Sequence, residues 1–259
     1  AALTITSPPR LVRKPDLEDS PTQELYQMGA FRYESLFVGL IERYHRREPP
    51  HADIELAVSR NGDDWTRVRP RTTFFAPPPD VRAQGCFDSA VATPGYGPPI
   101  RHAGALWFYY YGGPCFHGDR FLTADRNIGL AKLRPDGFAS LRAGSREGIA
   151  TTTPFVWPGG TLQFNARVLG GNLWLAYTPE SMDGWIRSEI LAASGNVLGG
   201  YGRDDSDPFY RDQIDHVPTW NSRAQDLAPL CGQRIALRFL LRMAEIYSFR
   251  SSSNIDAPE

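Results

Sequence analysis

Hydrophobic and polar residues alternate with a period of two along short runs of this chain, which is the pattern of half-buried β-strands. In the run Asp53–Ser59, every second residue is aliphatic. The dipeptide Asn61-Gly62 follows as a turn that favours positive φ, and Trp65 is placed to fold back over that turn. The pattern therefore predicts a β-hairpin over Asp53–Trp65.

A weaker copy of this hairpin pattern occurs downstream, in residues 126–138. Leu36 corresponds to Leu106 with a shift of 70 residues, and Ile54 corresponds to Ile128 with a shift of 74. One unit of three or four strands therefore recurs at about that period. Four-stranded sheets arranged as the blades of a β-propeller are the commonest architecture with such a repeat.

The pattern changes near Gly148, and the strands that follow are shorter and lack the repeat. In Arg234–Leu241 the alternation is that of a sheet with one buried and one wet face. Strands are also expected at 161–168, 172–177, 185–191 and 244–249, with a short helical turn at 224–230. The predicted domains are an extended, Pro-rich lead-in over residues 1–23, β-propeller blades over 24–148 and a jelly-roll-like β-sandwich over 149–259.

The composition favours an all-β protein, because 22 Pro, 24 Gly and 12% aromatic residues are typical of many short strands joined by tight turns. A net charge of −1 with no basic run argues against a nucleic-acid partner and favours a neutral or weakly charged ligand. No apolar run is long enough to span a membrane, and no signal-peptide order is present. The three cysteines are widely spaced, which favours buried free thiols. The compartment, cytoplasmic or secreted, stays open.

Several motifs in the first part of the chain resemble the later blades of five-bladed β-propellers of glycoside hydrolase families 32 and 43. They are Tyr33–Leu40, Ile54–Trp65, Phe87-Asp88-Ser89, Leu106–Gly113 and Ile128–Phe138. The downstream motifs are similar to the β-sandwich appended to uncharacterised bacterial members of that group. They are Gly195–Tyr201, Asp204–Asp207, Trp220, Leu230–Phe239 and Ile246–Phe249.

The resemblance implies a carbohydrate-active protein that acts on or binds a glycan in a propeller channel. Five blades need about 300 residues, whereas only about 150 precede the sandwich. We therefore expect missing N-terminal blades, or a partner chain, to complete the propeller. The alternative is a non-catalytic carbohydrate-binding or structural β-module.

Glycoside hydrolysis usually needs two carboxylates that flank the scissile bond. Glu34 and Asp88 are the candidates, because each follows an aromatic residue near the strand that begins a repeat. In a propeller, that position lines the central channel. The competing interpretation is that each acid serves in a turn or an ion pair.

Sugars also bind to aromatic faces, and the most strand-prone run, Leu106–Tyr111, is rich in them. Trp107, Tyr109 and Tyr111 alternate along it, and His117 lies in the loop that follows. We expect these four residues to contact the glycan. The alternative for Trp107 and Tyr109 is that they lie in the hydrophobic core.

Neither a metal nor a cofactor is expected from the sequence. The side chains considered as metal ligands show no ligand spacing on a common element: His45, His51, His102, His117 and Cys115. The run Asp204–Asp207 resembles a calcium loop in composition, but a solvated turn explains it as well. No phosphate-binding or dinucleotide-binding fingerprint is present.

Overall fold

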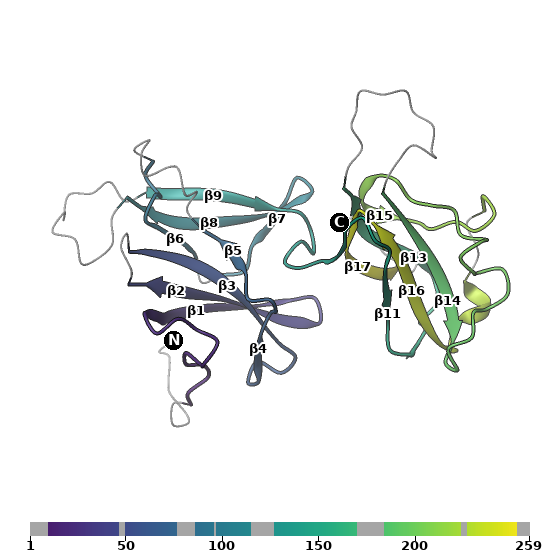
Figure 1. Cartoon of the computed structure of the whole chain (residues 1–259), viewed down its shortest axis with the longest axis horizontal. Coiled ribbons are helices and arrows are strands. Elements are labelled where there is room, and N and C mark those ends of the chain that lie inside the picture. The colour runs from purple at the N-terminus through teal and green to yellow at the C-terminus, as the bar shows by residue number, and fades with distance from the viewer. Residues whose placement is uncertain are drawn as a thin grey trace, which may run out of the picture. The chain divides into compact units, whose positions relative to one another are not determined.

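The computed structural model describes residues 10–46, 50–76, 86–95, 97–114, 127–169, 184–223 and 227–252. These residues form antiparallel β-sheets, and their one helix is the short 3-10 turn η3 (Ala228–Leu230). The all-β prediction is confirmed. No helix in this part of the chain is long and apolar enough to cross a membrane. The chain divides into two compact units, Ala1–Pro135 and Asp136–Glu259 (Figure 1).

The first sheet of the first unit is a meander in which sequential strands pair as neighbours. Its strands are β1 (Gln23–Tyr33), β2 (Leu36–His45), β3 (His51–Ser59) and β4 (Trp65–Arg67), with β5 (Thr73–Phe75) paired to β3. Strands β2 and β3 pair over their whole length, from Phe37 opposite Ser59 to His45 opposite His51.

The hairpin predicted over Asp53–Trp65 is confirmed. Gly62 has a φ of +83°, which L side chains rarely adopt. The indole Nε1 of Trp65 donates to the carbonyl oxygen of Gly62 at 2.8 Å, so the ring folds back over the turn as expected. Trp65 is buried with Ile41 and Ala57 on one face of the sheet.

The second sheet of the first unit is organised around β8, and its strands are β6 (Val91–Pro94), β7 (Ile100–His102), β8 (Ala105–Gly113) and β9 (Asn127–Leu133). Strand β9 pairs along β8 from Leu106 to Gly112, so β6 and β7 share the opposite edge of β8. The pair β8–β9 corresponds to the pair β2–β3, as the sequence repeat predicts.

The two sheets of the first unit lie face to face (Figure 1). Aromatic rings make the contacts between them. Phe31 of β1 lies 6.3 Å from Phe108 of β8, and Phe75 of β5 meets Tyr110 edge-on at 5.0 Å. The backbone amide of Ala52 also donates to the carbonyl oxygen of Ala90 at 3.2 Å. The two ring contacts use one face of β8, the face that carries its even-numbered residues.

The second unit consists of two four-stranded sheets. One contains β10 (Leu141–Ala143), β17 (Ala244–Ser252), β13 (Thr161–Val168) and β15 (Asp212–His216). The other contains β11 (Gly148–Thr151), β16 (Arg234–Arg242), β12 (Phe155–Val156) and β14 (Trp185–Ala192). Both sheets supply the same buried cluster, which includes Phe164 from one sheet and Ile190 and Leu237 from the other.

The boundary between the units differs from the predicted one. The first unit ends at Pro135, whereas the sequence pattern changes near Gly148. The difference arises because β10 pairs with β17 and β11 pairs with β16, so both belong to the second unit. The strand expected at 172–177 lies outside the described residues, and part of the expected helical turn is present as η3.

Gly129 provides a test of the packing within the second sheet. A Cβ added at this residue would lie 2.2 Å from Cζ of Tyr110, its partner across β8 and β9. Gly129→Ala should therefore destabilise the first unit by about 1–3 kcal/mol through overpacking. Faster hydrogen exchange of β8 and β9 amides measures the loss. Gly97→Ala is the control because an added Cβ there meets nothing within 4 Å, and equal effects of the two variants would contradict the assignment.

The second unit should lose stability in mild acid because of His216. Its imidazole packs against Phe164 and Phe209, and burial lowers its pKa from 6.5 to about 4. A lowered pKa stabilises the fold above pH 6.5, and this contribution is lost as the pH falls through about 4. Thermal unfolding of the second unit between these pH values measures the loss. His216→Phe should flatten the pH dependence, and an unchanged slope in that variant would exclude His216 as the cause.

Candidate functional site

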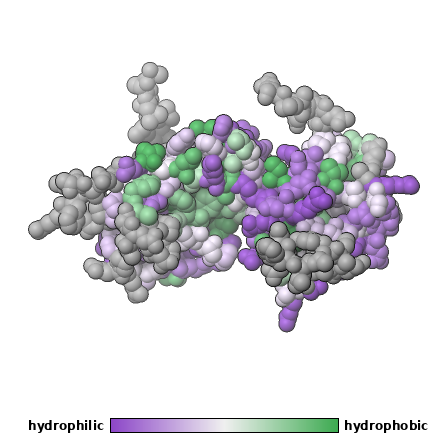
Figure 2. Space-filling view, turned by 90° about the horizontal axis from the view of Figure 1, so that it is seen from above, coloured by the Kyte–Doolittle hydropathy of each residue, from purple (hydrophilic) through white to green (hydrophobic). Residues whose placement is uncertain are grey.

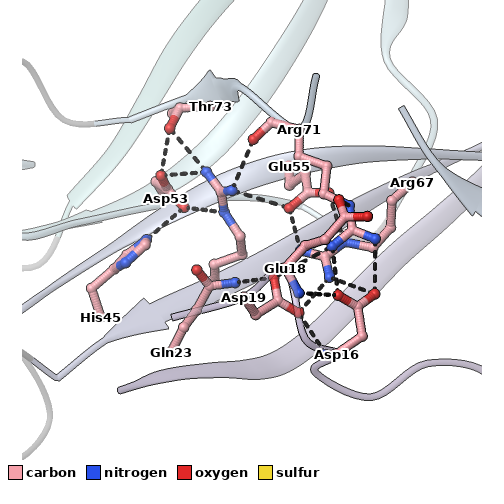
Figure 3. A network of polar contacts seen from close by, with 11 residues as sticks. Asp16, Glu18, Asp19, Gln23, His45, Asp53, Glu55, Arg67, Arg71 and Thr73 are labelled. Atoms are coloured by element: carbon pink, nitrogen blue, oxygen red, sulfur yellow. Dashed lines mark hydrogen bonds and ion pairs between the residues drawn. The ribbon is translucent and has the colours of Figure 1, made fainter. Parts of the chain in front are cut away.

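The largest group of buried charges lies on the first sheet, on the face opposite the aliphatic residues of β3 (Figure 3). Arg43 makes two hydrogen bonds to Asp53, both 2.7 Å, and a third to Glu55 at 3.0 Å. Arg67 holds the other side of Glu55 at 2.6 and 2.7 Å. Glu55 is 0% exposed, so two guanidinium groups neutralise a fully buried carboxylate between them.

The N-terminal lead-in completes this charge network (Figure 3). Asp19 receives two hydrogen bonds from Arg67, at 2.6 and 2.7 Å, and its side chain is 4% exposed. Asp16 forms a similar two-bond pair with Arg71 at 2.8 Å. The lead-in therefore covers this face of the first sheet and is fixed there by charge-assisted hydrogen bonds.

The carboxylates of the network are unsuited to acid catalysis. The hydrogen bonds from Arg67 lower the pKa of Asp19. Burial raises the pKa of Asp53, but hydrogen bonds from His45, Arg43 and Thr73 outweigh it and hold that pKa below its ordinary value. Both groups remain ionised near neutral pH with their oxygens occupied. The network is therefore a structural feature, although it contains the most deeply buried charges of the first unit.

The histidines form no metal site among the described residues. His45 and His51 stack at 4.5 Å across β2 and β3, and His45 also bonds Asp53 at 3.1 Å. No group of three or more His, Cys, Asp or Glu side chains in the described ranges is arranged to hold a metal ion. His102 lies elsewhere, edge-on to Trp107. Cys115 and His117 lie outside the described residues.

The acidic run Asp204–Asp207 closes a turn. Asp207 accepts hydrogen bonds from the Thr219 hydroxyl at 2.6 Å and the Ser222 amide at 2.7 Å. Asp205 accepts one from the Gly202 amide at 3.3 Å. These carboxylate oxygens organise the local backbone, and Asp205 and Asp207 are partly buried in the turn.

Glu34 lies in the tight turn between β1 and β2. It has a φ of 50°, and its side chain is 68% exposed. The carboxylate forms an ion pair with Arg101 of β7. Glu34 therefore has the surroundings of a turn residue in an ion pair, which is the alternative to a catalytic role.

Asp88 lies before β6, half-buried against the even-numbered face of β8. It accepts a hydrogen bond from the Tyr110 hydroxyl at 2.7 Å. Burial, and then this bond, raise the pKa of Tyr110 to about 12, so Tyr110 remains a proton donor to Asp88. The close approach requires Gly112, because a Cβ there would lie 2.8 Å from the Cβ of Asp88.

The structure does not bring Glu34 and Asp88 together. Arg101, the partner of Glu34, lies opposite Leu106 at the start of β8. Asp88 lies beside Gly112, six residues further along β8, which is about 20 Å at the ordinary rise of a strand. Two carboxylates that flank one glycosidic bond are about 5–10 Å apart.

The odd-numbered residues of β8 form the exposed face of the second sheet. Tyr109 is 50% exposed, and Trp107 and Tyr111 are partly exposed on either side of it. Cross-strand pairing adds Ile100, Ile128, Leu130 and Lys132 to the same face. We name this surface the β8 outer face. Figure 2 views the molecule from this side and shows hydrophobic residues gathered on the first unit, at the left.

The three aromatic residues of the β8 outer face differ in their surroundings. The Lys132 Nζ lies 4.6 Å from the ring centroid of Trp107, on the face of the indole. Tyr111 packs against the buried pair Ala90 and Val91. Tyr109 presents the most open ring of the three, since no charged or aromatic side chain of the described residues stacks on it.

A pocket of about 170 Å³ lies on the opposite side of β8. Its lining is mostly aromatic and includes Phe74, Phe75, Phe108 and Tyr110. The hydroxyl of Tyr110 is engaged by Asp88, so the pocket offers few free polar groups. It lies between the two packed sheets, and its lining also includes Lys132 of β9.

The charge network predicts that the loss of a buried carboxylate lowers the unfolding free energy more than the loss of an exposed one. Glu55→Gln leaves Arg43 and Arg67 without a shared counter-ion in a buried site, and should lower the unfolding free energy of the first unit by about 3–5 kcal/mol. Glu34→Gln removes an exposed pair and should change it by less than about 1 kcal/mol. The hydrogen-exchange rates of the β2 and β3 amides measure the loss of unfolding free energy in each variant. A loss no larger in Glu55→Gln than in Glu34→Gln would contradict the network's structural role.

Comparisons with known proteins find no sequence family for the chain and a low similarity to solved structures. No protein-family model matches the chain, and no curated protein matches it. A glycoside hydrolase structure shares 18% identity over 48% of this chain and 36% of its own, with a TM-score of 0.36. A Parabacteroides distasonis protein described as a glycoside hydrolase shares 12% over 75% of this chain and 61% of its own, with a TM-score of 0.30.

A family 32 β-fructofuranosidase of Bombyx mori shares 10% identity over 88% of this chain and 66% of its own, with a TM-score of 0.29. The chain spans less than two thirds of each of these proteins. These three proteins are described as glycoside hydrolases, and the similarity is too low to carry their activities over to this chain.

Proposed function

We propose that this protein binds a glycan on the β8 outer face. The observation that carries the proposal is the half-exposed ring of Tyr109, placed between Trp107 and Tyr111 on one strand. Alternate residues of a strand lie about 6.6 Å apart on one face. The three rings therefore form a row along which an extended oligosaccharide can lie.

The chemistry of sugars suits this row. The C–H groups on one side of a pyranose ring form a weakly positive, apolar surface, and the face of an aromatic ring is negative. Tyr109 offers such a face, and its hydroxyl remains available to sugar hydroxyls. The aliphatic neighbours Ile128 and Leu130 exclude water from the remaining edges of the ligand.

We propose binding without hydrolysis by the pair Glu34 and Asp88. A hydrolytic pair would need the two carboxylates to face each other across a cleft, and their positions at opposite ends of β8 disfavour it. The non-catalytic alternative is favoured for the described part of the chain. The assignment of the two sheets as blades of a five-bladed propeller, completed by further blades or by a partner chain, is the competing proposal, because a further blade would pack on the β8 outer face.

Tyr109→Ala tests the proposal directly. Removal of the open ring should weaken the binding of any oligosaccharide that the protein recognises by about tenfold, since a stacked aromatic contributes on the order of 1 kcal/mol or more. Isothermal titration with a panel of plant and bacterial oligosaccharides measures this. Tyr26→Ala is the matched control, because Tyr26 is a similarly exposed tyrosine on the first sheet. No binding by the unmodified protein, or an equal loss in both variants, would refute the assignment.

A further inference from the structure

Lys132 on the β9 side is the charged side chain that the strand register places on the β8 outer face among the described residues. The imidazole of His102 lies on the β7 side. No Asp or Glu of the described residues shares this face. The net charge of −1 for the whole chain therefore does not describe this surface, which is locally basic.

Lys132 is the central charge of the face. It is the cross-strand neighbour of Trp107 on the same face, and its ammonium group lies over the indole ring. No carboxylate among the described residues pairs with it. A cation on an aromatic face keeps part of its hydration and can still donate hydrogen bonds to a ligand.

The position of Lys132 relative to Tyr109 indicates which substituent a bound sugar should carry. Tyr109 pairs with Leu130, and Lys132 is two residues further along β9 on the same face. Such diagonal neighbours lie about 7–8 Å apart in a sheet. A substituent of a sugar ring stacked on Tyr109 can therefore reach the Lys132 ammonium, and a carboxylate is the sugar substituent that matches it.

We propose that the glycan bound at this face is acidic, with a uronate carboxylate paired to Lys132. This inference rests on the proposed glycan binding at Tyr109. In the bound state, one uronic acid ring stacks on Tyr109 while its carboxylate accepts hydrogen bonds from Lys132. His102 lies on the same face and offers a ring nitrogen for a hydrogen bond to the ligand.

The test compares uronate oligosaccharides with their methyl esters, which keep the sugar backbone and remove the charge. Oligomers of galacturonate, mannuronate and glucuronate, each as acid and ester, are titrated into the full chain by calorimetry. At least one acid should bind roughly fivefold or more tightly than its ester, and the difference should shrink as salt is added. Lys132→Gln should reduce the affinity for the acid to that for the ester.

The second lysine of the chain provides a matched control for Lys132, and amine labelling of both lysines provides a second measurement. Lys14 and Lys132 are the only two lysines of the chain. Lys14→Gln should leave binding unchanged, because Lys14 lies in the lead-in. A bound uronate should also protect Lys132 from an amine-reactive reagent, with Lys14 as the internal reference in the mass spectrum.

Each outcome decides between the two proposals. Equal binding of acid and ester, lost in Tyr109→Ala and retained in Lys132→Gln, would overturn the acidic-glycan inference and leave glycan binding intact. Absence of binding by every acid and ester, together with no binding to the neutral panel, would overturn both. An acid preference that persists in Lys132→Gln would also overturn the role of Lys132.

Discussion

The buried carboxylate of Glu55, held between the guanidinium groups of Arg43 and Arg67, is the constraint on which the first unit depends. Charges in such a position are tolerated only when every partner is present. Asp19 supplies the last partner from the lead-in, and it is almost fully buried. The described part of the lead-in, residues 10–22, is therefore tied to the first sheet by these charge pairs.

This arrangement buries both faces of the first sheet. One face carries the charge network, which the lead-in covers, and the Trp65 cluster, and the other packs against the second sheet. The second sheet has no equivalent cover on its far side in the described part of the unit. The β8 outer face combines the open ring of Tyr109 with two further aromatic residues on one strand, which is why the binding proposal is placed there.

The sequence predicts the local structure well and the pairing of faces poorly. The Asp53–Trp65 hairpin follows from turn chemistry within a few residues, and alternation shows that β8 is a strand. Both faces of β8 are aromatic, however, so alternation alone cannot say whether Tyr109 or Tyr110 points to solvent. The charge network does not follow from the sequence, because Asp53 and Glu55 are typical of a wet strand face. Asp19, which also binds Arg67, lies 48 residues from it in sequence.

The basic character of the β8 outer face argues for a glycan over a further protein sheet as its occupant. Another sheet packed on this face would remove Lys132 from water, and a buried ammonium without a carboxylate costs several kcal/mol. A glycan keeps water and hydroxyl groups at the interface, so it solvates the ammonium while its apolar side covers Tyr109. Exposed aliphatic residues such as Ile128 suit a glycan and a protein sheet equally well. Lys132 distinguishes the two occupants, because the hydrated surface of a glycan solvates its ammonium group, whereas a protein sheet would need a carboxylate to pair with it.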